Sequence, residues 1–182
     1  WGAAGGLGVM AIQIAKMFRA NVIAVASSDE KLELCKQIGA DHLINRNTQD
    51  VRKEVRNIVG RKGVNIVFEH PGEATIPTSI FTCEAGGMVV ICAGTTGYSA
   101  SVDLRYHWVR QKRLQGSHGA NDKQASAYNQ LVCNAKIDPC LGDVYRFEDI
   151  GQAHAEMEEG TVVFGNRVAL VGAPETGMGR NK

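Results

Sequence analysis

The 182-residue sequence lacks several features that would narrow its class at once. No apolar run is long enough to cross a membrane, and no signal peptide is recognisable. Neither sign of charge dominates: 20 Lys and Arg stand against 19 Asp and Glu, which gives a net charge of +1. This balance argues against a nucleic-acid partner. With 44% apolar and 21% charged residues, the composition predicts an ordinary globular domain of useful core size.

The five cysteines also lack a pattern. None forms a Cys-x-x-Cys pair, and no histidine lies at zinc-finger spacing, so the sequence predicts no metal site and a zinc-independent protein. Their number is odd and several lie in apolar runs. We therefore expect free thiols in a reducing cytoplasm. The residues are Cys35, Cys83, Cys92, Cys133 and Cys140.

The most informative feature that is present is a glycine cluster, Gly2-Ala3-Ala4-Gly5-Gly6-Leu7-Gly8, followed by an apolar stretch with helical periodicity. A tight turn with free N–H groups at a helix start is a pyrophosphate site. We expect the cofactor to contact Ala4, Gly5, Gly6 and Leu7. The motif requires a preceding strand, yet only Trp1 precedes Gly2. The interpretation is a truncated chain that lacks its first strand and an N-terminal substrate domain.

Strand-like and helix-like segments alternate along the chain, which predicts an α/β fold with a doubly wound, Rossmann-type parallel sheet over residues 1–172. We expect two half-sheets with open edges where the first strand is missing. Residues 173–182 form a Gly/Pro-rich C-terminal tail. The expected helices are 7–18, 29–38, 49–59, 74–81, 105–111, 123–135 and 148–158, and the expected strands are 21–26, 42–45, 64–68, 87–93, 114–116 and 167–171.

The strand after the first helix ends in Val25-Ala26-Ser27-Ser28, where NAD-binding domains usually carry an acid for the ribose hydroxyls. Small hydroxyl side chains leave room for a 2′-phosphate, and Lys31 could supply positive charge. These residues favour NADPH over NADH. The alternative is that Ser27 and Ser28 only cap the next helix, although Ser28 could do so while Ser27 binds phosphate.

Two further segments lie at predicted carboxyl ends of strands. In Phe68-Glu69-His70-Pro71-Gly72 the proline and glycine force a turn, which should direct Glu69 or His70 toward the cofactor. A histidine there could donate a hydrogen bond to an anionic oxygen, but the sequence alone slightly favours a histidine that only satisfies backbone groups of the turn. The loop at Ala93, Gly94 and Thr95 would lie near the nicotinamide, unless it is an ordinary connection.

Together the glycine cluster, these segments, Gly87–Tyr98 and Arg110–His118 resemble the crotonyl-CoA carboxylase/reductases of the medium-chain dehydrogenase/reductase superfamily, quinone oxidoreductase type. The similarity is less specific after Asp122. It implies an NADP(H)-dependent reductive carboxylase acting on an α,β-unsaturated acyl-CoA and CO2, and a homo-oligomer. It also implies that His70 helps to hold CO2, while Glu69 either orients His70 or caps the strand.

Two alternatives stay open. A plain NADPH-dependent enoyl-CoA or quinone reductase would need the same glycine turn and the same Ser27 and Lys31 pocket. A non-catalytic nucleotide-binding fragment would need no substrate domain at all.

Overall fold

The computed structural model describes residues 1–161 and 163–172. The predicted tail, 173–182, lies outside the described residues. All described strands pair in parallel. β1 (Ile23–Ala26) pairs with β2 (His42–Asn45), and β4 (Cys83–Ile91) lies between β3 (Val64–Glu69) and β5 (Arg113–Gly116). The predicted α/β class and parallel pairing are confirmed.

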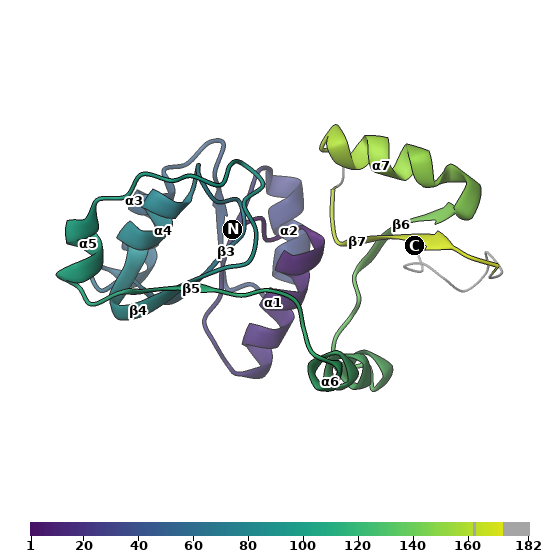
Figure 1. The fold of residues 1–182 in the computed structure, drawn as a ribbon, viewed down its shortest axis with the longest axis horizontal. Helices are drawn as coiled ribbons and strands as arrows, with labels where there is room; N and C mark the ends of the chain where they lie inside the picture. Colours follow the sequence, from purple (N-terminus) through teal and green to yellow (C-terminus); the bar gives the residue numbers. More distant parts are fainter. Residues whose placement is uncertain (162, 173–182) are drawn as a thin grey trace.

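Seven α-helices connect or follow these strands in the described part of the chain (Figure 1). Side-chain caps explain several of their first residues: Ser28, Asp50 and Asn121 each accept a hydrogen bond from a backbone N–H of the first turn. The helices are α1 (Gly6–Met17), α2 (Asp29–Gln37), α3 (Val51–Val59), α4 (Ile76–Thr82), α5 (Leu104–Trp108), α6 (Asp122–Cys133) and α7 (Ile150–Glu158), with a 3₁₀ turn at Phe147–Asp149.

The first three residues lie between the two sheets. The backbone N–H of Ala3 donates to the Val25 carbonyl of β1 at 3.1 Å. The Trp1 amino group donates to the Phe68 carbonyl of β3, also at 3.1 Å. Residues 1–3 therefore join β1 to β3, and the order across the molecule is β2, β1, residues 1–3, β3, β4, β5. This is the order of a doubly wound sheet, with residues 1–3 at its first-strand position.

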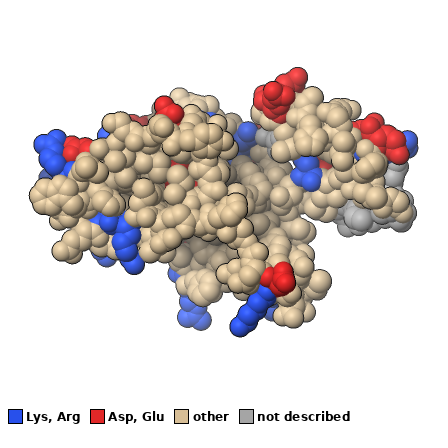
Figure 2. All heavy atoms as spheres, viewed as in Figure 1, with Lys and Arg blue, Asp and Glu red and all other residues tan. Residues whose placement is uncertain are grey.

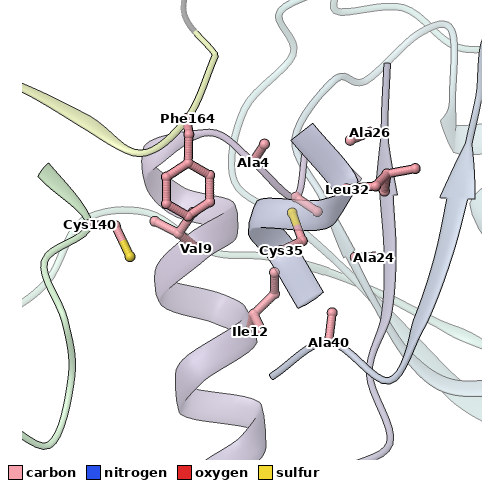
Figure 3. Close-up of a cluster of buried hydrophobic side chains, with 11 residues drawn as sticks. Ala4, Val9, Ile12, Ala24, Ala26, Leu32, Cys35, Ala40, Cys140 and Phe164 are labelled. Atoms are coloured by element: carbon pink, nitrogen blue, oxygen red, sulfur yellow. The ribbon is translucent and has the colours of Figure 1, made fainter. Parts of the chain in front are cut away.

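The main core lies where α1 and α2 pack beside β1 (Figure 3). Val9 of α1 and Cys35 of α2 are fully buried, and Leu32 fills the space beside them. Phe164 and Cys140 come from the C-terminal part of the chain and pack against α1 from the other side. This contact fixes α1, and with it the turn that starts it.

The sequence did not predict β6 (Leu141–Arg146), which pairs with β7 (Asn166–Leu170) in a separate two-stranded sheet beside α7. Three of its six residues, Leu141, Val144 and Tyr145, are partly buried and the other three are exposed. Its register with β7 shifts between Leu141 and Val144. A short, half-exposed and irregular strand has no apolar alternation by which it could be recognised.

The surface is mixed. On the face drawn in Figure 2, Lys, Arg, Asp and Glu side chains form small scattered groups among wide areas of other residues. Among the described residues, no helix combines the length and apolar character needed to cross a bilayer.

Candidate cofactor site

The turn before α1 is built for close backbone packing. Gly2 has a φ of 55°, a left-handed conformation that favours glycine. A Cβ on Gly8 would overlap the carbonyl oxygens of Gly2 and Ala3. No side chain caps the helix start, and the N-cap residue Gly5 is exposed. The first-turn N–H groups of a twelve-residue helix are thus open to an anion, as a pyrophosphate site requires.

The C-terminal part of the chain borders this turn. Gly165 forms a parallel bridge with Gly5, and its N–H donates to the Ala4 carbonyl at 2.7 Å. A Cβ on Gly6 would overlap the side-chain oxygen of Asn166. This contact could not be predicted from the sequence, because nothing in the local pattern brings residues 165 and 166 back to the start of the chain.

Ser28, just after β1, caps the next helix, as the sequence predicted for one of its two possible roles. The Ser28 hydroxyl oxygen accepts from the Lys31 N–H at 3.3 Å and so caps α2. The Ser27 and Lys31 side chains are partly exposed. Within the described residues, the Ser27 hydroxyl makes no hydrogen bond and the Lys31 ammonium makes no ion pair. Both groups are therefore available to a phosphate at the carboxyl edge of the sheet.

Glu69, the last residue of β3, is fully buried. Its Oε1 accepts from the Gly72 N–H at 3.0 Å and from the Thr75 hydroxyl at 2.6 Å. Its other oxygen accepts from the Ser79 hydroxyl of α4, which also accepts from the Trp1 indole N–H at 2.7 Å. The Glu69 side chain thus holds the turn that contains His70 and fixes it to α4 and to Trp1.

His70 follows Glu69, and its ring lies against Gly2, where any Cβ would overlap Cε1. Its Nε2 is 2.8 Å from the Trp1 carbonyl oxygen. A carbonyl can only accept, so the neutral ring carries its hydrogen on Nε2 and leaves Nδ1 as an acceptor. Burial lowers the pKa of His70 below its usual value. In this arrangement His70 fixes the edge of β3 to the glycine turn.

The loop after β4 packs on the same turn. The N–H of Thr95 donates to the His70 carbonyl at 3.4 Å, and that of Thr96 donates to the Pro71 carbonyl at 2.8 Å. A Cβ on Gly72 would come within 2.8 Å of the Gly94 Cα. Ala93 and Thr95 are exposed and Gly94 is partly exposed. The structure therefore brings the loop of residues 93–95 and the His70 turn together at one edge.

A second histidine lies at this edge. β5 ends at Gly116, and the next N–H, that of Ser117, donates to the Ile91 carbonyl at the end of β4 at 2.9 Å. His118 follows directly and is exposed. His118 lies two residues past the end of β5, a place that the predicted strand 114–116 makes visible in the sequence.

These elements define a class. The class is a Rossmann-type dinucleotide-binding domain. It is defined by parallel strands, a glycine turn at an uncapped helix start, and partly exposed polar residues at the ends of neighbouring strands. The family model for zinc-binding dehydrogenases matches residues 6–134, and the chain belongs to that family. It represents the C-terminal part of the medium-chain dehydrogenase/reductase superfamily.

The expected similarity to crotonyl-CoA carboxylase/reductases is confirmed. The chain is 44% identical to the crotonyl-CoA carboxylase/reductase of Cereibacter sphaeroides over 98% of its own length and 47% of that protein. It is 40% identical to the crotonyl-CoA reductase of Streptomyces avermitilis, over 98% of the chain and 44% of that protein. The solved structure of the crotonyl-CoA carboxylase/reductase AntE in complex with NADP superposes with a TM-score of 0.91 at 41% identity, covering 96% of this chain and 49% of AntE. The chain thus spans about half the length of these relatives.

The family name implies a zinc ion. Within residues 1–161 and 163–172, no three His, Cys, Asp or Glu side chains gather closely enough to hold a metal ion. The described residues therefore do not fit a zinc centre of their own.

Proposed function

We propose that this chain is the cofactor-binding portion of an NADPH-dependent reductive carboxylase that converts an α,β-unsaturated acyl-CoA and CO2 to an alkylmalonyl-CoA. One observation carries the proposal: the glycine turn, the acid-free end of β1, the His70 turn and the loop after β4 all lie at the carboxyl edge of the sheets. The relatives named for this reaction match almost the whole chain.

The residues present fit NADP(H). The uncapped start of α1 offers N–H groups to the pyrophosphate, with Ala4, Gly5, Gly6 and Leu7 around it. Ser27 and Lys31 would hold a 2′-phosphate, while Ser28 keeps its capping role. Ala93, Gly94 and Thr95 would border the nicotinamide. An N-terminal substrate domain would supply the remaining walls of the active site.

When bound, the reduced nicotinamide supplies a hydride to the β-carbon of the acyl-CoA, and the resulting enolate adds CO2 at its α-carbon. The carboxyl edge must then exclude water, which would protonate the enolate instead. CO2 gains negative charge on its oxygens, so a nearby N–H donor stabilises the transition state. We assign this donor role to His70, with Glu69 as the residue that positions its turn. For His70 to donate to CO2, its Nε2 must leave the Trp1 carbonyl or its Nδ1 must be protonated.

The test uses the full-length protein with crotonyl-CoA, NADPH, labelled bicarbonate and carbonic anhydrase. Labelled ethylmalonyl-CoA is the expected product. His70→Asn should raise the share of butyryl-CoA, and His118→Asn is the matched control, because it removes the other imidazole at the same edge. If only His118→Asn changes the product ratio, the donor role belongs to His118.

The second candidate is a plain NADPH-dependent enoyl-CoA or quinone reductase. The hydrogen bond from His70 to Trp1 favours it, because a histidine with that structural role gives no help to CO2. The name of one relative, crotonyl-CoA reductase, also supports reduction without carboxylation. Butyryl-CoA without any labelled product would establish this function.

The third candidate is a nucleotide-binding fragment without catalysis. Turnover of residues 1–182 with and without an added N-terminal segment tests it: turnover in neither sample, alongside NADPH binding, would support the fragment.

We further propose that the full-length protein is a cytoplasmic homo-oligomer. The five free cysteines support a reducing compartment, and the similarity to the carboxylase/reductases supports the oligomer. Light scattering on the purified full-length protein tests the assembly, and a monomer would contradict it.

A further inference from the structure

The end of β2 lies directly beside the end of β1, at the expected position of the adenosine ribose. In the parallel register Ala26 of β1 pairs with Asn45 of β2, and the Arg46 N–H donates to the Ala26 carbonyl at 2.9 Å. Residues 45–47 therefore run alongside Ser27. No sequence pattern marked them, because their place depends on the pairing of the two strands.

Asn45 binds the first acid that follows β1. Its Nδ2 donates to Oδ1 of Asp29 at 2.8 Å, and the Asn45 residue is only 6% exposed. A carboxylate just after this strand is the group that holds the ribose hydroxyls in NAD-dependent domains. Here one oxygen of the Asp29 carboxylate is bound to the side chain of Asn45 on the neighbouring strand β2.

Asn45 is itself held on several sides. Its N–H donates to the Gln49 side-chain oxygen at 2.8 Å, and its own side-chain oxygen accepts from the Asn47 N–H at 3.1 Å. The Asn47 side chain then donates to the Ser27 carbonyl at 2.8 Å. The turn over residues 45–49 is thus tied to the end of β1 by side-chain hydrogen bonds.

Arg46 is the one residue of this turn with a positive charge. It is exposed, and within the described residues its guanidinium makes no hydrogen bond or ion pair. Asp29 is exposed with one oxygen bound to Asn45, and Glu30, the next acid, is also exposed. A free guanidinium on a turn that runs alongside the end of β1, where Ser27 lies, is suited to a phosphate group.

We propose that Asn45 and Arg46 determine the choice of cofactor: Asn45 keeps the Asp29 carboxylate from the ribose, and Arg46 joins Ser27 and Lys31 in binding the 2′-phosphate of adenosine. This inference rests on the proposed NADP(H) function and names the residues that select NADP(H) over NAD(H). The ligand class is a 2′-phosphorylated adenine nucleotide.

Calorimetric titration of the full-length protein with adenosine 2′,5′-bisphosphate and with adenosine 5′-monophosphate isolates the 2′-phosphate. Arg46→Gln should weaken binding of the bisphosphate about tenfold, as expected for the loss of one charge-assisted hydrogen bond. Binding of the monophosphate should not change. Arg61→Gln, which removes an exposed arginine before β3 at the opposite edge of the sheet, is the matched control and should change neither affinity. Equal weakening of both nucleotides by Arg46→Gln, or no weakening, would overturn the role of Arg46.

Asp29→Asn tests the role of Asn45 without disturbing that buried residue. Because the Asp29 carboxylate is kept from the ribose, the affinity for NADH should stay within about twofold of the wild type. A tenfold loss of NADH affinity would show that Asp29 reaches the ribose and would overturn this part. Should the wild-type protein itself prefer the 5′-monophosphate, the NADP(H) function fails. A wild-type preference for the bisphosphate that Arg46→Gln leaves undiminished contradicts only this inference.

Discussion

The Oε1 atom of Glu69 accepts a 3.0 Å hydrogen bond from the backbone N–H of Gly72 and so closes the turn that carries His70. Glu69 is the last residue of β3, and His70 follows it. Their side chains have different surroundings, because successive side chains of an extended chain point to opposite faces. Glu69 contacts α4, whereas His70 contacts the glycine turn. This arrangement couples the cofactor turn to the edge where the chemistry is proposed.

Glu69→Gln should lower the stability of the full-length protein by about 1–3 kcal/mol, because the new NH₂ group would face donors in place of an acceptor. Urea unfolding followed by circular dichroism measures the change. Glu73→Gln is the matched control, since Glu73 is exposed a few residues further on, and it should cost little. Equal effects of the two substitutions would show that the hydrogen bonds of Glu69 do not stabilise the turn.

Gly8→Ala should disrupt the glycine turn. Its Cβ would overlap backbone carbonyl oxygens of Gly2 and Ala3, and overpacking of this kind costs about 1–3 kcal/mol. We expect the affinity for NADPH to fall together with the stability. Gly151→Ala, in open space on α7, should instead stabilise by about 0.5–1 kcal/mol. Thermal unfolding and NADPH titration of both variants check the prediction, and normal NADPH binding by Gly8→Ala would contradict it.

The buried His70 should make stability depend on pH. Burial holds the pKa of His70 below that of the unfolded chain, so the unfolded state binds more protons as the solution is acidified. The contribution of His70 is therefore present above the unfolded pKa of about 6.5 and is lost as the pH falls below it. Urea midpoints between about pH 8 and pH 5.5 should fall less steeply for His70→Gln than for the wild type. Parallel curves would show that His70 titrates normally.

The cysteines should differ widely in reactivity. Cys133 is exposed at the end of α6, whereas burial raises the pKa of the Cys35 thiol to about 11. An aromatic disulfide reagent should modify Cys133 rapidly and leave Cys35, Cys83 and Cys140 protected until the protein unfolds. Cys133→Ser should abolish the fast phase, and Cys35→Ser should leave it intact. A fast phase that survives Cys133→Ser would contradict the described burial.

Local sequence patterns predicted much of the fold. The strand at His42–Asn45 was predicted with its observed bounds, and the helix start at Asp29 was predicted with Ser28 as its cap. The helix predicted from residue 123 begins one residue earlier, at Asp122, where Asn121 caps it. The glycine cluster predicted an open helix start because its chemistry is contained within a few consecutive residues. β6 was missed, because its pairing with β7 joins segments about twenty-five residues apart and leaves no local periodicity.

The candidate site was predictable only where its residues are neighbours in the sequence. The bond between Asn45 and Asp29 depends on the register of two strands, and the contact of Asn166 with Gly6 depends on the return of the chain from β6. The division of roles between Glu69 and His70 depends on which face of β3 each side chain occupies, and the sequence left that open.

The proposal of reductive carboxylation is tested most directly by the stoichiometry of the full-length protein. NADPH oxidation and labelled carbon fixed into acyl-CoA are measured in the same reaction with crotonyl-CoA, excess labelled bicarbonate and carbonic anhydrase. We predict one carbon fixed for each NADPH oxidised, with ethylmalonyl-CoA as the product. NADPH oxidation that yields butyryl-CoA and fixes no label would contradict reductive carboxylation.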